Sequence, residues 1–247
     1  MKILVAISNV PDTTTKIAFT NGDSEFNKAG VQFIINPYDE WYALVRALEL
    51  KESGKAATVS LLHVGLADSE ATIRKGLALG ADDAVRINAE SPDAYFVAEQ
   101  IAKYSKENNY DLILVGKETI SYNGSSVGAM VGGLMDIPFV SLATKLELNG
   151  NLATIEHDID GGSLVVECNT PMVISCAKGM AEQRIPNMRG IMAARTKPIT
   201  VVDAMVTEKL TSVKTFALAS GRMACKFIDA DNPEALVNLL HTEAKVI

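Results

Sequence analysis

Apolar and polar positions form blocks along the chain that predict strands and helices in turn. Residues 2–8 are a continuous apolar run that ends at Ser8, Asn9 and Pro11, which is typical of a buried parallel strand entering a loop. Similar runs predict strands at residues 58–64, 84–87 and 111–116.

Helices are predicted between these strands by caps and by apolar residues at helical spacing. Asn36 can cap a first helix, Pro37 suits its first position, and Gly54 ends it. Residues 68–79 predict a second helix, closed by Gly80, and Ser91-Pro92-Asp93 opens a third. The alternation predicts an α/β fold, with a mostly parallel Rossmann-like sheet and helices on both faces.

The pattern changes after Pro138. Turn residues 149–151 and 161–162 separate apolar runs, so we expect added antiparallel strands at 140–148, 152–158, 163–166 and 172–176. Residues 181–215 show no helical or strand period and predict an extended C-terminal arm, before a last helix at 233–244. We therefore expect a nucleotide-binding domain at 1–180, and at 181–247 a partner-docking loop, arm and helix that pack mainly on a second subunit.

Composition narrows the class of protein. Hydrophobic residues make up 48% of the 247 residues, enough for a sizeable core. The net charge of −7 argues against nucleic acid and anionic membranes as main partners. The start is too short and too soon charged for a signal peptide, and no apolar stretch approaches the roughly 20 residues of a membrane helix. We expect a soluble, cytoplasmic protein with no membrane insertion, although a trimmed transit peptide stays open.

The cysteines and histidines predict neither catalysis nor metal binding. Cys168, Cys176 and Cys225 follow no metal-ligand spacing, so buried free thiols in a reducing compartment are expected. No nucleophile elbow of the Gly-x-Ser-x-Gly type occurs. Asp82, Asp83, Asp158 and Asp160 lie beside glycine turns, where solvent-exposed carboxylates are usual, so they do not indicate a metal site. The histidines lie far apart in the chain: His63, His157 and His241.

A ligand site is predicted where strands end, because ligands of open α/β sheets bind beyond the carboxyl ends of the strands. Residues 6–15, 64–67 and 116–128 fall there. In the last segment a polar loop enters a helix, where backbone amides suit a phosphate and Ser125 and Ser126 add hydroxyl groups. The loop matches neither a Walker loop nor a Rossmann fingerprint, so an ordinary capped loop is an equal alternative.

One segment is basic although the whole chain is acidic. No acidic residue occurs between Gln183 and Val202, and adaptable methionines lie among the cations. This composition suits docking onto an acidic partner with an apolar centre, and packing on the protein itself or on a permanent subunit is the alternative. The residues concerned are Arg184, Ile185, Met188, Arg189, Ile191, Met192, Arg195 and Lys197.

These features together resemble the electron-transfer flavoprotein beta subunit over essentially the whole chain. No single marker is decisive, but their order and spacing are specific. The markers are the Lys-Ile-Leu-Val-Ala start, Val10-Pro11-Asp12-Thr13, Asn36-Pro37-Tyr38-Asp39-Glu40, Gly80-Ala81-Asp82, Asp111-Leu112-Ile113-Leu114-Val115-Gly116-Lys117, Asp160-Gly161-Gly162, Gly190-Ile191-Met192-Ala193-Ala194-Arg195 and the ending Glu243-Ala244-Lys245-Val246-Ile247.

The resemblance implies a non-catalytic electron carrier subunit of a heterodimer. In this family the alpha subunit holds most of a flavin adenine dinucleotide (FAD), and the beta subunit covers one side of it and buries a structural AMP. Electron-bifurcating members bind a second FAD in place of AMP. The implied partners are the alpha subunit, acyl-CoA or similar dehydrogenases and a quinone oxidoreductase. A stand-alone nucleotide-binding module similar to universal stress proteins, or an adenylating ligase, would instead require loop glycines or a Ser-Gly-Gly motif that this chain lacks.

Carried over by position, the resemblance implies an adenine near Ala6 and Val64 and a phosphate at residues 124–128. The sequence departs from the family loop, which has aspartates and a glutamine where this chain has Ser121, Tyr122, Asn123 and Ser126. In the partner-recognition loop, residues 186–199, Met188 replaces the family's anchoring leucine. The implied nucleotide-binding residues are Ala6, Asn36, Pro37, Tyr38, Asp39, Val64, Gly116, Lys117, Glu118, Thr119, Ile120, Ser121, Tyr122, Asn123, Gly124, Ser125, Ser126 and Val127.

Overall fold

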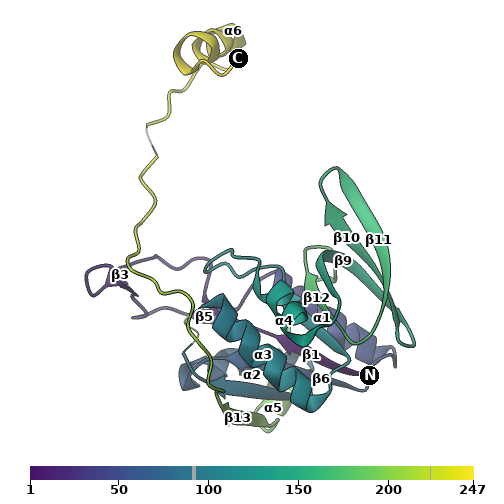
Figure 1. Ribbon diagram of the computed structural model, residues 1–247. Helices are drawn as coiled ribbons and strands as arrows, with labels where there is room; N and C mark the ends of the chain where they lie inside the picture. The colour runs from purple at the N-terminus through teal and green to yellow at the C-terminus, as the bar shows by residue number, and fades with distance from the viewer. Residues whose placement is uncertain (91–92, 223) are drawn as a thin grey trace.

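The computed structural model describes residues 1–90, 93–222 and 224–247, and its body is built on a nine-stranded sheet (Figure 1). The strand order is β11-β10-β9-β12-β8-β1-β6-β7-β13. Six strands form a parallel run: β1 (Lys2–Ala6), β6 (Thr58–Val64), β7 (Asp83–Asn88), β8 (Leu112–Gly116), β12 (Met172–Cys176) and β13 (Ile199–Asp203). β9 (Phe139–Asn149) is parallel to β12, and β10 (Leu152–Ile159) and β11 (Gly162–Asn169) continue the sheet antiparallel.

Helices cover both faces of the sheet, as predicted. α1 (Asp39–Glu52) and α2 (Glu70–Leu79) share one buried cluster with Ile3 and Val5, whereas α3 (Ala94–Asn108) and α4 (Val127–Met135) share the other with Leu4. Successive residues of β1 thus point into opposite cores, and a parallel strand buried on both faces has to be apolar throughout. Each fully buried Leu or Ile contributes roughly 1.5–3 kcal/mol to folding.

The first helix begins later than the sequence predicts. α1 starts at Asp39, and Tyr38 precedes it with φ of 67°, so neither Pro37 nor an Asn36 cap opens the helix. Asn36 is instead buried and bonded to a distant loop. The predicted opening at Ser91-Pro92 lies outside the described residues, while the Asp93 side chain caps α3 by accepting from the Phe96 N–H at 2.7 Å.

The expectation of no regular structure at residues 181–215 was wrong. α5 (Met188–Ala194) packs on α2, and β13 pairs in register with β7 from Ile199 opposite Ala84 to Asp203 opposite Asn88. These elements are held by contacts with α2 and β7, which are distant in sequence, and so the local pattern of apolar residues does not reveal them. Residues 188–203 thus pack on the chain's own body, and packing of this region on a second subunit stays a prediction. The division of the chain at residue 180 stays a prediction.

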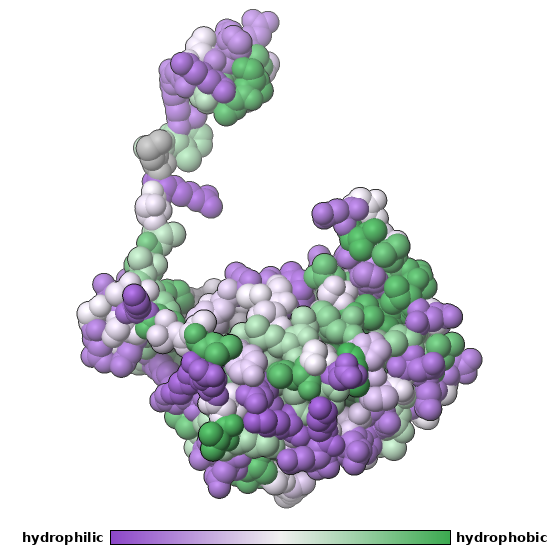
Figure 2. All heavy atoms as spheres, in the orientation of Figure 1, coloured by the Kyte–Doolittle hydropathy of each residue, from purple (hydrophilic) through white to green (hydrophobic). Residues whose placement is uncertain are grey.

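An extended segment, described at residues 204–222 and 224–232, leads from β13 to a helix away from the body (Figure 1). We call this segment the arm. The predicted last helix is α6 (Pro233–Leu239), which continues as one π-helical turn, η2 (Leu240–Ala244). Figure 2 shows apolar surface on this helix and on the β10–β11 hairpin. The exposed apolar residues there include Leu236, Val237, Leu164 and Val165.

Small elements surround the first loop of the chain. β2 (Asn9–Pro11) pairs with β5 (Phe33–Ile35), and β3 (Phe19–Thr20) pairs with β4 (Glu25–Phe26). A 3-10 turn, η1 (Ala67–Ser69), precedes α2. All three cysteines are free, but only Cys176 is buried; Cys168 is half-buried and Cys225 is exposed on the arm, contrary to the expectation of buried thiols.

No helix in the described part of the chain is both long and apolar enough to cross a membrane.

Candidate functional site

A cavity of about 420 Å³ lies at the carboxyl ends of β1, β6 and β8. This size falls within the roughly 300–1,000 Å³ of small-molecule sites, and the position is where open α/β sheets bind ligands. Strand ends, the first turns of α3 and α4, the loop after β8 and a short stretch of the arm form its walls.

The floor of the cavity is apolar. Ala6, Leu62 and Val64 come from the strand ends, and Val97 and Ile101 come from one face of α3. Such a surface can accept the faces of a flat heterocycle, because burying apolar area is favourable without directional bonds.

The loop after β8, residues 117–126, forms the polar rim. Lys117 Nζ lies 3.1 Å from Glu118 Oε1, and the Ser125 hydroxyl donates to Glu118 Oε2 at 2.9 Å. The hydrogen bond from Ser125, followed by that from Lys117, holds the pKa of Glu118 below its usual value. Asn123 and Ser125 both have φ of 48°, so the chain turns sharply just before α4.

The side chain of Asn36 holds this loop from below. Its Nδ2 donates to the Glu118 carbonyl at 2.9 Å, and its Oδ1 accepts from the Ile120 N–H at 2.8 Å. With only 1% of Asn36 exposed, losing either bond would leave a buried polar group without a partner. The residue expected to cap α1 therefore positions the loop.

The start of α4 supplies donors to the same rim. The Met130 N–H bonds to the Ser126 carbonyl at 3.0 Å, so the N–H groups of residues 127–129 precede the first helical bond. Such groups together with the helix dipole favour an anion, and Ser126 and Val127 line the cavity. Gly128 is required here, since a Cβ would lie 2.8 Å from Phe139 and Val115 side-chain atoms.

A buried carboxyl lies beneath the loop after β1. Glu40 is 4% exposed, and its two oxygens accept from the Ser8 N–H at 2.5 Å and the Ser8 hydroxyl at 2.6 Å. Burial raises the pKa of Glu40 to about 8, against the effect of both bonds from Ser8. Burial likewise raises the pKa of the adjacent Asp39.

His63 is the histidine of the cavity wall. Its Nδ1 lies 2.8 Å from the Ile7 carbonyl, and burial lowers its pKa, so the neutral ring is favoured. Among the described residues, no three His, Cys, Asp or Glu side chains gather in a group that could hold a metal ion.

The structure brings together most of the residues that the sequence suggested for a nucleotide. The residues of that set that do not line the cavity are Asn36, Pro37, Tyr38, Asp39, Ile120 and Asn123, and Tyr38 is 61% exposed. The lining residues from that set are Ala6, Val64, Gly116, Lys117, Glu118, Thr119, Ser121, Tyr122, Gly124, Ser125, Ser126 and Val127.

Sequence reasoning missed several lining residues, among them Glu40, His63 and Asp93 as well as parts of α3 and the arm. Val97 and Ile101 have the helical spacing of core residues, so nothing in the sequence separated a cavity wall from a core. Thr211, Ser212 and Val213 come from the arm, more than eighty residues after Val127, and no sequence signal marked them.

A second surface gathers on and beside α5. Ile185, Met188, Ile191 and Met192 are all exposed there, with Met188 at 73%, and we call these four residues the α5 patch. Arg189 and Arg195 are exposed beside it.

The other two cations of this segment bond within the chain. Arg184 forms a two-bond ion pair with Glu52, at 2.6 and 3.0 Å. Lys197 Nζ donates to the Leu77 carbonyl at 3.0 Å and also to the Ala81 carbonyl. Both residues therefore fasten the segment to the body, whatever further role they have.

Comparison with known proteins assigns the family. The model of the electron transfer flavoprotein domain matches residues 24–207. The chain belongs to the electron-transfer flavoprotein beta-subunit family. It is 34% identical to the electron transfer flavoprotein subunit beta of Bacillus subtilis (strain 168), covering 100% of both chains. It is also 33% identical to that of Bradyrhizobium diazoefficiens, again over 100% of both chains. A third relative is the acryloyl-CoA reductase electron transfer subunit gamma of Anaerotignum propionicum, 31% identical over 88% of this chain and 84% of that protein.

Proposed function

We propose that this chain is the non-catalytic beta subunit of a heterodimeric electron-transfer flavoprotein that binds one AMP in the cavity. The lining of the cavity carries the proposal, because it combines an apolar floor, a polar loop and a helix start in the space of one mononucleotide. The adenine would lie against Ala6, Val64 and Val97, and the phosphate at the start of α4 beside Lys117.

In the heterodimer this subunit would lie against an FAD held mainly by the alpha subunit. The flavin supplies the redox chemistry when bound, and this chain's residues bind, orient and dock. The α5 patch would receive a dehydrogenase, since a few exposed apolar side chains at the centre of an interface carry most of the binding energy. The arm and α6, with exposed Phe227, Leu236 and Val237, would pack on the alpha subunit.

The first experiment counts nucleotides. The chain is co-expressed with its alpha subunit, and the purified complex is denatured and its supernatant quantified. We expect one AMP and one FAD per heterodimer. Two flavins without AMP would identify the alternative in which a second FAD occupies this site, and no adenine compound beyond one FAD would overturn the AMP assignment.

A pair of variants localises the phosphate. Ser126 precedes α4 and lines the cavity without making a side-chain cap bond. Asp and Asn are both good residues before a helix, so Ser126→Asp and Ser126→Asn should both preserve α4. Only the aspartate places a negative charge where the phosphate is expected. We expect Ser126→Asp to purify without AMP and Ser126→Asn to retain it; AMP retained by both would place the phosphate elsewhere.

A further inference from the structure

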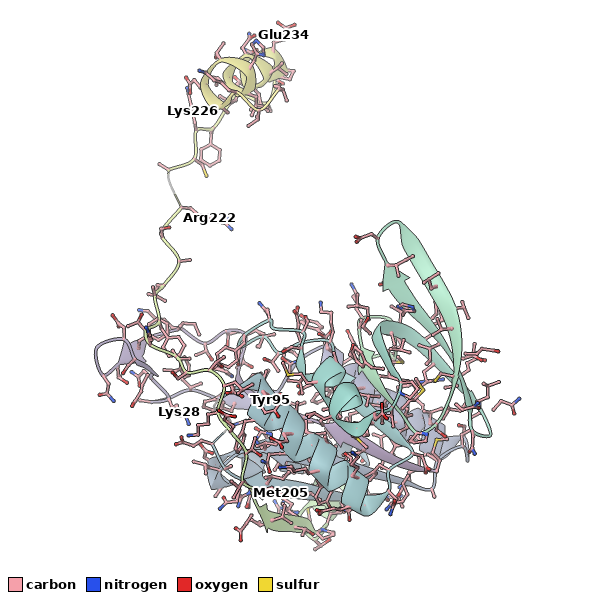
Figure 3. All side chains as sticks on the ribbon, in the orientation of Figure 1. Lys28, Tyr95, Met205, Arg222, Lys226 and Glu234 are labelled. Atoms are coloured by element: carbon pink, nitrogen blue, oxygen red, sulfur yellow. The ribbon has the colours of Figure 1, made fainter. Side chains whose placement is uncertain are left out.

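The arm forms one wall of the cavity. After β13 it passes the N-terminal end of α3, and Thr211, Ser212 and Val213 line the cavity. Figure 3 shows it rising from Met205 and passing Tyr95, in the first turn of α3, before it continues toward Arg222 and away from the body. We call residues 205–216 the strap.

The lower end of the strap is bonded to a buried amide. Gln100 on α3 is fully buried, and its Nε2 donates to the Met205 carbonyl at 2.9 Å and the Thr207 hydroxyl at 2.8 Å. Its Oε1 accepts from the Met205 N–H at 2.9 Å. This end of the strap is therefore anchored beside the sheet, close to β13.

Asp93 holds the strap at the cavity itself. Its Oδ2 accepts from the N–H groups of Leu210 at 2.7 Å and Thr211 at 2.9 Å, while its Oδ1 caps α3 through Phe96. One carboxylate thus joins the start of α3, which lines the cavity, to the stretch of arm that closes the same side.

Beyond the cavity the strap reaches the β3–β4 hairpin. The ring of Phe216 stacks on that of Phe19, with centroids 5.0 Å apart and planes 11° from parallel. The Phe216 N–H also donates to the Asp23 carbonyl at 2.7 Å. The strap is therefore fastened on both sides of the wall that it forms.

Apart from a hydrogen bond from Lys103 Nζ to the Val206 carbonyl at 3.3 Å, few contacts within the described part of the chain hold this wall. Val206 is 99% exposed and Leu210 is 56% exposed, so the strap between its anchors buries little apolar surface. The other walls belong to strands, helices and a loop held by Asn36. A segment held by a few hydrogen bonds and little buried apolar surface opens locally at a small cost in free energy, whereas the strands of a core open only with global unfolding.

We propose that the strap is the removable wall of the nucleotide site and that Asp93 is its latch, so that the nucleotide exchanges when the strap lifts. This inference rests on the proposed function of the cavity as an AMP site. Because the strap continues into the rest of the arm and then α6, a partner that holds the far end of the arm also holds this wall closed. Asp93 is thus a positioning residue for nucleotide retention.

The test measures release of AMP from the complex with the alpha subunit. The complex is loaded with radiolabelled AMP and chased with excess unlabelled AMP. Asp93→Ser keeps a good cap for α3, but its short single hydroxyl cannot also hold the strap. Losing two hydrogen bonds to a charged group should speed release about 10- to 100-fold. Asp160→Ser, in the β10–β11 turn, makes the same change of charge and should leave release unchanged.

A second variant removes a different anchor. Phe19→Ala abolishes the stack with Phe216 in an exposed hairpin and leaves α3 untouched. It should also speed release, and in both variants hydrogen exchange at Leu210 and Thr211 should be faster while flavin content is unchanged. Wild-type release rates in both variants would overturn the latch while leaving the AMP site in place. A wild-type complex without AMP would overturn the proposed function itself and the gating role with it.

Discussion

A side-chain carbon at Gly190 would lie 2.2 Å from the carbonyl oxygen of Ala78. The backbone of α5 at Gly190 therefore lies directly against the end of α2, with no room for a side chain between them. Arg74 strengthens the same junction by donating to the carbonyls of Ala194 at 2.7 Å and Lys197 at 2.6 Å. The exposed α5 patch therefore rests on a rigid support rather than on a flexible loop.

Gly190→Ala should displace α5 from α2, because a backbone carbonyl cannot move aside as a side chain can. We expect a loss of roughly 1–3 kcal/mol in the free energy of unfolding, measured by urea titration. Gly133→Ala is the matched control, since a Cβ there meets nothing within 4 Å and α4 should gain up to about 1 kcal/mol from the better helix former. Equal stability of the two variants would show that α5 yields freely.

Asn36→Ala should weaken AMP binding without unfolding the protein. The substitution removes both bonds to the loop after β8 and leaves the Glu118 carbonyl and the Ile120 N–H unpaired. Unpaired buried groups cost roughly 1–3 kcal/mol, which corresponds to about 10- to 100-fold weaker binding by calorimetry. Asn151→Ala, in an exposed turn, is the control and should bind AMP like the wild type. Unaltered affinity in Asn36→Ala would mean that the loop after β8 holds its shape without the two hydrogen bonds of Asn36.

The buried half of the fold could be predicted from sequence because its signal is local. Thr58–Val64 and Met172–Cys176 are mostly apolar runs, and both strands have the predicted bounds. The expected antiparallel direction of Met172–Cys176 was wrong, because β12 lies inside the sheet and is parallel to β8. β13 was missed because Pro198 precedes it and Val201 is 50% exposed, so neither a buried run nor an alternation appears. Its identity as a strand comes from pairing with β7, which no window of sequence contains.

The candidate site divides in the same way. The loop after β8 was found from its own polar, small residues, which lead into a helix. Asn36 was assigned a cap because it precedes a proline and two acids, but its partners Glu118 and Ile120 lie more than eighty residues away. The strap could not be found at all, since its place at the cavity depends on Gln100, Asp93 and Phe19.

Glu40→Gln should change how stability depends on pH. The pKa of Glu40 is raised from 4.5 to about 8 in the folded state, so the folded protein keeps a proton there that the unfolded chain has lost. The contribution of this group to stability is therefore full below about pH 4.5 and falls by up to roughly 1.4 kcal/mol per pH unit as the pH rises toward 8. Glutamine keeps the shape and has no proton to lose.

Urea unfolding at about pH 5, 6.5 and 8 measures this effect, with the nucleotide content held constant. The free energy of unfolding of Glu40→Gln should rise relative to that of the wild type as the pH rises. Glu107→Gln, on the exposed side of α3, is the matched control and should follow the wild type at every pH. A constant difference between Glu40→Gln and the wild type would mean that Glu40 is ionised throughout this range.

Met188→Ala should slow reduction of the flavin by a cognate dehydrogenase. Met188 belongs to the α5 patch and is 73% exposed, and its flexible thioether can fill an imperfect pocket on a partner. Loss of an anchor of this kind costs about 2 kcal/mol, or roughly a thirtyfold lower rate at subsaturating dehydrogenase. Flavin content and heterodimer stability should not change. Leu164→Ala, on the β10–β11 hairpin, is the control for loss of an exposed apolar side chain and should reduce normally.

Arg195→Gln, compared with Met188→Ala at several ionic strengths, separates charge from anchoring. Arg195 is exposed beside the patch, whereas Arg184 is already paired with Glu52, so steering of an acidic partner should depend on Arg195 more than on Arg184. Stopped-flow reduction should show Arg195→Gln slowest relative to wild type at low salt and equal to it at high salt, because exposed charges are screened. The Met188→Ala defect should persist at every salt concentration, because apolar contacts are not screened. If the Met188→Ala defect also disappears with added salt, the patch steers but does not anchor, and if the variant loses its alpha subunit, the patch belongs to the subunit interface.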